Sequence, residues 1–416
     1  MKIVKAYNSV SLIVRIICGL IIGVVLGLFF DDLFLISAMG KIFVGALKGV
    51  APILVFVIVV SALARGNDKL DRRFGLVIAL YMTSTFLASF AAVVGSFIFP
   101  QTIVLTEAAE AEVVPTGVGE VMMNLVMSMI GNPVESVQKG IYIGILFWSV
   151  MLGFAAKKTA SDVTKQFFGD IADIVSMSVR WIINLAPFGI LGLVYENVST
   201  NGVAIFAVYG QLLALLIGCM LFVALVVDPV LVAIVIRANP YPLVFRCLRE
   251  SGVTAFFTRS SAANIPVNME LCKNLGLDEE MYAVSIPLGA TINMDGAAVT
   301  IAVMSLAAAN TVGIKVSFTT ALILAFIATL AACGASGIAG GSLLLIPMAC
   351  SLFGVNPDVA MQVVAVGFII GVVQDSVETA LNSSGDVIFT AAAEYSQWKR
   401  KGKPLPGFLG GTAEKH

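Results

Sequence analysis

The sequence predicts an all-α protein that crosses a bilayer several times, and three observations support this fold class. Of its 416 residues, 59% are hydrophobic and only 12% are charged, whereas soluble domains carry about 25% charged residues. Apolar runs recur along the chain at lengths close to the roughly 20 residues that a membrane-spanning helix requires. The lysines and arginines lie mostly between these runs and in the C-terminal tail. We therefore expect a polytopic membrane protein in contact with a lipid bilayer.

Composition also excludes several functions. A net charge of −1 gives no basis for nucleic acid binding. The six cysteines form no CxxC pair or metal-like cluster, so we interpret them as small core residues. His416 is the only histidine, which argues against histidine-based catalysis or a histidine proton relay. With no HExxH or GxSxG motif either, we expect no enzyme.

The first part of the chain contains six expected spans. They cover residues 13–30, 42–63, 74–99, 141–156, 171–195 and 203–236, with a kink at Pro187 in the fifth. Residues 100–137 form an acidic connection with five glutamates and no lysine or arginine. Because cations follow the even-numbered spans, the positive-inside rule places both termini in the cytoplasm.

The second part of the chain breaks this simple pattern. Four apolar segments remain, at residues 246–274, 281–310, 316–353 and 359–393. Two full crossings already return the chain to the cytoplasm, so we expect the first and third segments to be re-entrant hairpins with tips at Ser260–Ser261 and Gly337–Gly341. Such a pair in matching positions indicates inverted repeats and the binding site of a transporter. The alternative is that 316–353 is one ordinary span with a glycine-rich packing face.

The last apolar segment carries an unusual polar face. Five residues fall within roughly a 100° arc of one helix: Asp375, Glu378, Thr379, Asn382 and Asp386. Three carboxylates facing lipid would cost on the order of 8–10 kcal/mol, so they must face protein, water or a ligand. A buried polar seam between helices is one explanation, and a site for ions and a polar solute is the other.

A second polar centre lies in the middle of 281–310. Asn293, Met294 and Asp295 stand between Gly289 and Gly296, where glycines let a helix unwind and expose carbonyls to a cation. We expect Ser383–Gly385 of the last helix to unwind similarly. Acids beside open backbone favour sodium over a proton, although a buried carboxylate that titrates near neutrality keeps proton coupling open.

Four motifs in order carry a family resemblance. TRSSAANIP, PLGATINMDG, GASGIAGG and DSVETALNSSGD resemble the dicarboxylate/amino acid:cation symporters, the glutamate transporter family. The resemblance implies a secondary transporter of the bacterial inner membrane, with eight transmembrane helices and two re-entrant hairpins. It also implies a homotrimer and an elevator motion of a transport domain against a scaffold. The domains would be residues 1–73 (scaffold helices 1 and 2), 74–100 (transport-domain helix 3), 101–200 (acidic external loop and scaffold helices 4 and 5), 201–396 (helices 6 to 8 with both hairpins) and 397–416 (cytoplasmic tail).

The same resemblance implies the ligands of the coupling sodium ions. One site would use Gly289, Asn293, Asn382 and Asp386. A second would use Thr291, Met294, Ala332, Cys333 and Ala335. A third would use Asn293 and Asp295 with Tyr81, Ser84 and Thr85. For an amino acid substrate, Ser261, Gly337 and Ile338 would hold the α-carboxylate, Asp375 the α-ammonium, and Thr379 and Asn382 would contribute further contacts.

One position departs from the acidic-substrate members. They place an arginine where this chain has Glu378, and Ala297 replaces a hydroxyl residue. A glutamate would repel a second carboxylate but accept a hydrogen bond from a hydroxyl, so we expect small neutral amino acids, serine and threonine first and alanine next. The pattern resembles the serine/threonine:sodium symporter branch. Alternatives are an ion pair of Glu378 with Arg259, a sodium- or proton-coupled carrier of other small amino acids or dicarboxylates, and an ion channel along the same path.

Overall fold

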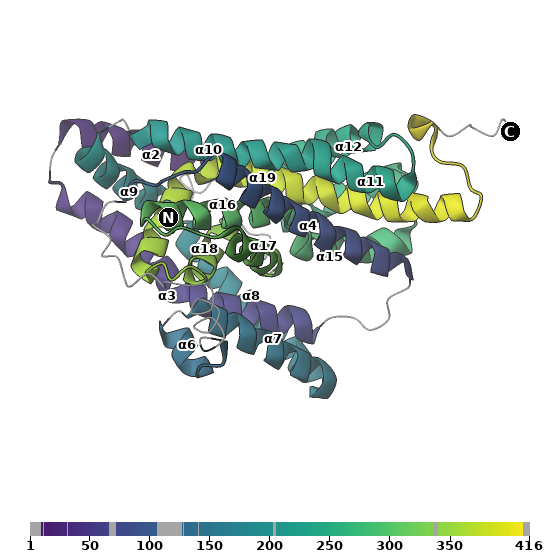
Figure 1. Ribbon diagram of the computed structural model, residues 1–416, viewed down its shortest axis with the longest axis horizontal. Coiled ribbons are helices and arrows are strands. Elements are labelled where there is room, and N and C mark those ends of the chain that lie inside the picture. The colour runs from purple at the N-terminus through teal and green to yellow at the C-terminus, as the bar shows by residue number, and fades with distance from the viewer. Residues whose placement is uncertain are drawn as a thin grey trace.

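A computed structural model describes residues 10, 12–30, 32–65, 72–105, 127, 129–139, 141–202, 205–333, 335 and 340–410. Within these ranges the chain forms helices and connecting turns, without any strand. Figure 1 shows most helices running along the long axis of the molecule. The predicted all-α class is confirmed for this part of the chain.

The first group of helices follows the predicted spans closely. It comprises α2 (Leu12–Phe29), α3 (Phe34–Ala64), α4 (Arg72–Ile98), α6 (Pro133–Lys139), α7 (Tyr142–Thr159), α8 (Asp162–Ile183) and α9 (Ala186–Asn201). α8 and α9 bend by 51° at their junction, beside Pro187, which confirms the predicted kink. α3 begins earlier than predicted because the apolar sequence continues back to Phe34. Most of the acidic connection lies outside the described residues.

The sixth span and the first hairpin follow. The span consists of α10 (Ile205–Phe222), the π-helical turn η1 (Val223–Val227) and α11 (Asp228–Ile236). The hairpin consists of α12 (Tyr241–Cys247), the π-helical η2 (Leu248–Gly252), α13 (Val253–Thr258) and α14 (Ser261–Asn274). The chain reverses at Arg259, whose φ is 51°. Ser260 then caps α14 by accepting a hydrogen bond from the Ala263 N–H. The predicted chain reversal is confirmed, while the re-entrant position of this hairpin in the membrane stays a prediction.

The remaining elements are α15 (Glu279–Ile292), α16 (Asp295–Thr311), α17 (Phe318–Ala332), the 3₁₀ turn η3 (Ser342–Leu345), α18 (Ile346–Ser351), α19 (Pro357–Arg400) and the 3₁₀ turn η4 (Gly407–Leu409). The helix breaks at Asn293–Met294, as predicted. The expected unwinding of α19 at Ser383–Gly385 is wrong, because the helix is continuous through it. There the Ser384 hydroxyl donates to the Ala380 carbonyl of the same helix, 2.7 Å away.

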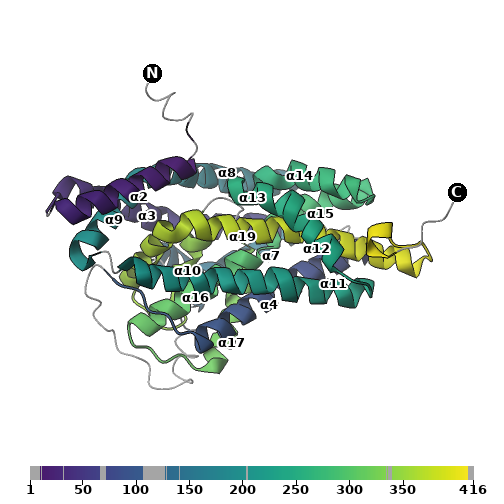
Figure 2. The ribbon, with the colours of Figure 1, turned by 90° about the horizontal axis from the view of Figure 1, so that it is seen from above.

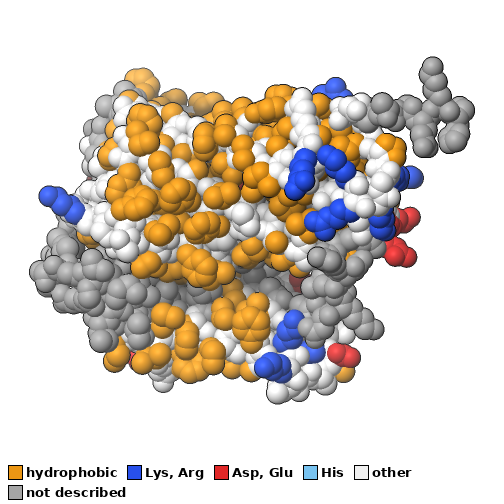
Figure 3. Space-filling view, turned by 45° about the vertical axis from the view of Figure 1, so that its right-hand side comes forward, with side chains coloured by type: hydrophobic (Ala, Val, Ile, Leu, Met, Phe, Trp, Pro, Cys, Tyr) orange, Lys and Arg blue, Asp and Glu red, His pale blue; other side chains and the backbone are white. Residues whose placement is uncertain are grey.

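Four described helical segments are long and apolar enough to cross a membrane: Phe74–Ile98, Phe206–Ile236, Glu279–Thr311 and Pro357–Arg400. The bent pair α8–α9 adds a fifth if it counts as one span. Figure 3 shows apolar side chains over much of one face, with lysines and arginines gathered mainly toward one end. These features support a multi-pass membrane protein, while the count of eight spans stays a prediction.

Helix packing separates the chain into two groups. α2 packs along α9, and α3 packs on α7, α8 and α9, whereas α4 and the helices from α10 onward surround α19. Figures 1 and 2 both show α19 in the middle of this second group. Gly19, Gly23 and Gly27 bring α2 so close to α9 that a Cβ at Gly19 would lie 2.3 Å from the Pro187 carbonyl oxygen. Small residues allow this close contact between apolar helices.

Candidate functional site

A small enclosed pocket lies where the polar face of α19 meets the tip of the first hairpin and the break before α16. Its volume is about 10 Å³, and its lining residues are Ser261, Met294, Ala335, Ser342, Asp375, Glu378, Thr379 and Asn382. Five of these are predicted substrate contacts, three are predicted cation ligands because Asn382 belongs to both sets, and Ser342 was not predicted. The space is no larger than a single water needs, so an amino acid can enter only after one of the walls moves.

Arg259 pairs with Asp375, one of the residues that line this pocket. The arginine Nε lies 2.6 Å from Asp375 Oδ2, and both side chains are buried. The other carboxylate oxygen accepts a hydrogen bond from the Gly340 N–H at 3.2 Å. The proposed ion pair between Arg259 and Glu378 is therefore wrong. Arg259 contacts the acid one turn nearer the start of α19.

Glu378 is held by three polar side chains that the sequence analysis did not identify. Ser342 Oγ lies 2.9 Å, Thr300 Oγ1 2.7 Å and Gln374 Nε2 2.5 Å from the same oxygen, Glu378 Oε2. No described residue donates a hydrogen bond to the other oxygen, Oε1. Gln374 was recognisable in the sequence, since it precedes Glu378 by four residues and shares its helix face. Ser342 and Thr300 come from distant elements, η3 and α16.

Asn382 connects α19 to the break between α15 and α16. Its Oδ1 accepts a hydrogen bond from the Gly296 N–H at 2.8 Å, and its Nδ2 lies 3.5 Å from Met294 Sδ. Its own carbonyl accepts a hydrogen bond from Asn293 Nδ2 at 3.0 Å. The side chains of the two predicted polar centres are thus in direct contact.

Asp386 is fully buried beside the predicted first cation site. Asn293 Nδ2 lies 3.2 Å from its Oδ1, and the Tyr81 hydroxyl donates to its backbone carbonyl at 3.1 Å. A Cβ at Gly289 would lie only 2.6 Å from Asp386 Oδ1. The structure therefore brings Gly289, Asn293, Asn382 and Asp386 together. It also places the Tyr81 hydroxyl at Asp386, although the sequence analysis grouped this residue with Asp295.

Asp295 begins α16 and lies against α4. The hydroxyls of Ser84 and Thr85 donate to its two carboxylate oxygens at 2.6 Å and 2.8 Å. All three side chains are fully buried. Nearby, Asn293 Oδ1 is buried and has no hydrogen-bond partner among the described residues. These contacts unite Ser84, Thr85 and Asp295 as predicted.

The predicted second cation site is the least complete in the structure. The Cys333 thiol lies 3.5 Å from the Ile292 carbonyl oxygen, and Met294 and Ala335 line the small pocket. Thr291 is exposed and its hydroxyl donates to the Leu288 carbonyl, and Ala332 is buried at the end of α17. Gly337 and Ile338, predicted to hold the substrate carboxylate, lie outside the described residues.

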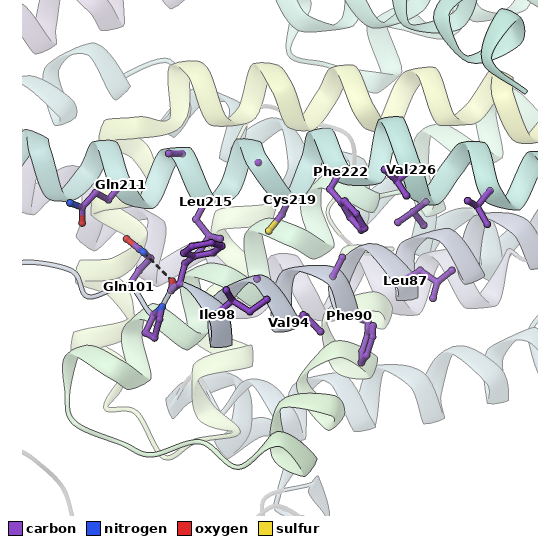
Figure 4. A pocket seen from close by; sticks show the side chains of 18 of the residues that line it. Leu87, Phe90, Val94, Ile98, Gln101, Gln211, Leu215, Cys219, Phe222 and Val226 are labelled. Atoms are coloured by element: carbon purple, nitrogen blue, oxygen red, sulfur yellow. Dashed lines mark hydrogen bonds between the residues drawn. The ribbon is translucent and has the colours of Figure 1, made fainter.

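A much larger pocket lies elsewhere and has a different character. It measures about 1290 Å³ and lies between α4 and the α10–α11 span. Figure 4 shows that Leu87, Phe90, Leu215 and Phe222 are among the apolar side chains that line it. It shares no lining residue with the polar pocket, and it offers no charged group to a polar solute.

The polar centre contains carboxylates, amides and hydroxyls, without a histidine or an activated nucleophile. Oxygen-rich buried sites of this kind suit hard cations. The pocket beside them combines a carboxylate able to bind an ammonium with the N-terminus of α14, which favours an anion. The arrangement is therefore suited to binding cations together with a zwitterion.

Comparison with known proteins agrees with this chemistry. The profile described as the sodium:dicarboxylate symporter family matches residues 12–396. A protein of Bifidobacterium adolescentis named serine/threonine transporter SstT is 59% identical over 403 residues, covering 97% of this chain and 94% of the relative. Proteins of the same name from Streptococcus thermophilus and Streptococcus agalactiae serotype III are 54% and 52% identical over 400 and 401 residues, with 96% of this chain covered in both cases.

Proposed function

The chain belongs to the sodium:dicarboxylate symporter family, and from this premise we propose that it imports serine and threonine together with sodium ions. The observation that carries the choice of substrate is Glu378 in the wall of the pocket. The identity of 52–59% to proteins named serine/threonine transporters supports the same choice. The protein acts as a transporter and not as an enzyme.

The amino acid binds with its ammonium at Asp375 and its α-carboxylate at the start of α14. In the closed pocket, Asp375 forms an ion pair with the buried Arg259. The substrate ammonium replaces the Arg259 guanidinium as the cation paired with Asp375. Ser261 begins α14, and the N–H groups of a first helical turn have no partners within the helix and carry partial positive charge. Thr379 and Asn382 complete the pocket, and Gly337 and Ile338 supply backbone groups from the second hairpin.

Glu378 sets the selectivity through its second oxygen. All three described donors contact Oε2, so Oε1 is left to accept a hydrogen bond from the substrate hydroxyl. Hydrogen bonds to a charged group contribute roughly 1.5–3 kcal/mol. A dicarboxylate would place a second negative charge at the same point, and like charges in contact cost several kcal/mol. Serine and threonine therefore bind better than alanine, and aspartate is rejected.

Sodium is the coupling ion and is carried as cargo. Gly289, Asn293, Asn382 and Asp386 form one site, and Asp295 with Ser84 and Thr85 forms another. Support comes from the burial of both aspartates and from the unpartnered Asn293 Oδ1. The predicted second cation site uses Thr291, Met294, Ala332, Cys333 and Ala335. Tyr81 joins the site at Asp386, where its hydroxyl lies.

Alternating access follows the family's elevator motion within a trimer in the bacterial inner membrane, with both termini in the cytoplasm. The division into residues 1–73 and 101–200 as scaffold and residues 74–100 and 201–396 as transport domain is supported by helix packing, since the helices pack in two corresponding groups. The gathering of lysines and arginines mainly toward one end of the molecule (Figure 3) supports the orientation of the chain in the membrane. The small closed pocket agrees with a state in which neither side has access.

A competition assay tests the proposed substrate. Purified protein in liposomes with an inward sodium gradient takes up radiolabelled serine, and excess unlabelled amino acids compete. We expect threonine to compete as well as serine, alanine less, and aspartate not at all. Competition by aspartate at the same concentration as unlabelled serine would favour a dicarboxylate carrier. Sodium currents in the absence of any amino acid would favour a channel.

A further inference from the structure

Asp228 is a buried acid that none of the expected cation sites includes. It is the single charged residue of the apolar span Phe206–Ile236, and its side chain has no exposed surface. Val230, two residues further on in the same helix, is exposed. A carboxylate in such a span marks an ion pathway or a ligand site more often than a structural contact.

An irregular backbone directs this acid inward. The π-helical turn η1 directly precedes Asp228, and such turns shift the following side chains around the helix and recur at functional sites. Pro229 has no N–H to donate to the Leu225 carbonyl, and the Tyr241 hydroxyl donates to that carbonyl instead at 3.2 Å. The irregularity is thus supported by a side chain from α12.

One serine hydroxyl stands between Asp228 and Asp295. Ser84 Oγ lies 2.8 Å from Asp228 Oδ1 and 2.6 Å from Asp295 Oδ2. A hydroxyl has a single proton, so it can satisfy only one of the two carboxylates. Asp228 Oδ2 is buried and has no hydrogen-bond partner in the part of the chain that the structure describes.

No side-chain cation compensates these two acids. Within the described ranges, neither Asp228 nor Asp295 forms an ion pair with a lysine or arginine. The one buried arginine of the substrate site, Arg259, is paired with Asp375. Because isolated buried carboxylates are very costly, the two acids require either a bound cation or a proton.

We propose that Asp228 is a ligand of the sodium ion that binds at Asp295, an inference that rests on the proposed sodium coupling. Asp228, Ser84, Thr85 and Asp295 offer an oxygen-only set from three helices, which suits a hard cation. The unpartnered Asp228 Oδ2 is the free ligand atom. The second carboxylate strengthens sodium binding through its charge, and the ion ties α11, α4 and α16 together.

Sodium-dependent stability of the purified full-length protein tests this inference without any transport. A bound ligand stabilises the folded state in proportion to the logarithm of its concentration. We expect sodium chloride, compared with choline chloride at equal ionic strength, to raise the Tm of the unaltered protein. In Asp228→Asn, a higher sodium concentration should be needed to reach half of the increase in Tm that the unaltered protein shows. We expect this concentration to rise by at least about tenfold. Ser305→Ala, which removes another buried hydroxyl from α16, should respond like the unaltered protein.

Two results would overturn the inference. One is an unchanged sodium response in Asp228→Asn. The other is a changed pH dependence with an unchanged sodium response, which would indicate a proton held between the two acids. Either result can occur while serine uptake remains sodium-dependent, so it would contradict the role of Asp228 and leave the proposed function intact.

If Asp228→Asn does not fold, Asp228→Glu provides the second measurement. This variant keeps the charge and moves the carboxylate by one methylene. We expect a changed ratio between the lithium and sodium concentrations required for half of the increase in Tm. An unchanged ratio would show that the carboxylate does not contact the ion.

Discussion

Arg259 Nε lies 2.6 Å from Asp375 Oδ2, so the tip of the first hairpin is fastened to α19 by a buried ion pair. The guanidinium occupies the position at Asp375 where we propose that the substrate ammonium binds. Since removal of one partner from a buried ion pair typically costs about 3–5 kcal/mol, Arg259 can leave only when another cation replaces it. Binding of the amino acid and release of the hairpin tip are thereby connected.

Asp375→Asn should abolish serine uptake, with a decrease of at least about 100-fold, because the variant loses the charge that binds the ammonium. Uptake into proteoliposomes with a sodium gradient measures this effect. Asp170→Asn removes an exposed acid from α8 and should transport normally. Near-normal uptake by Asp375→Asn would remove Asp375 from the substrate site.

Arg259→Met should make the protein less stable without substrate and more responsive to serine. The variant leaves Asp375 buried without its cation, so the substrate ammonium restores a larger part of the lost stability. Thermal unfolding with and without saturating serine measures both effects. A serine-dependent increase in Tm no larger than that of the unaltered protein would contradict the exchange of arginine for ammonium.

Glu378→Gln should reduce the preference for serine over alanine. The charged acceptor for the substrate hydroxyl becomes neutral, and the difference of roughly 1.5 kcal/mol or more corresponds to about tenfold in relative affinity. Competition of each amino acid against radiolabelled serine gives the ratio. A preserved ratio would contradict a contact between Glu378 and the substrate hydroxyl.

Gly192→Ala should destabilise the contact between α3 and α9. A Cβ at this position would lie 2.4 Å from both the Gly40 nitrogen and the Ile36 carbonyl oxygen, and overpacking of this kind costs roughly 1–3 kcal/mol. Gly218→Ala is the matched control, since nothing lies within 4 Å of its added methyl group. We expect a lower Tm only for Gly192→Ala. Equal Tm values for Gly192→Ala and Gly218→Ala would mean that α3 and α9 can move apart without loss of stability.

The sequence was sufficient to predict the helices, the kink at Pro187, the first hairpin and the break at Asn293–Met294. These features depend on local signals, namely apolar length, proline, glycine and polar interruptions. The unwinding expected at Ser383–Gly385 was wrong, because the Ser384 hydroxyl bonds to carbonyls of its own helix and α19 is packed among the surrounding helices. Local composition does not distinguish these outcomes.

Pairing between distant residues was harder to predict. The polar face of α19 was evident from its spacing, but the partner of each acid depends on tertiary contacts. Arg259 was expected at Glu378 and lies at Asp375, while Thr300 and Ser342 contact Glu378 from elements with no sequence signal for that role. Asp228 was visible only as an interruption of a span, and its contact with Ser84 became apparent in the fold.

The most direct measurement is the accumulation of radiolabelled serine in proteoliposomes under an inward sodium gradient, compared with choline in place of sodium and an equal pH gradient in both. Because we assign the buried carboxylates of Asp295 and Asp386 to bound sodium ions, we predict accumulation above the external concentration with sodium and none with choline. Equal accumulation with choline would contradict sodium coupling and show that the acids carry protons.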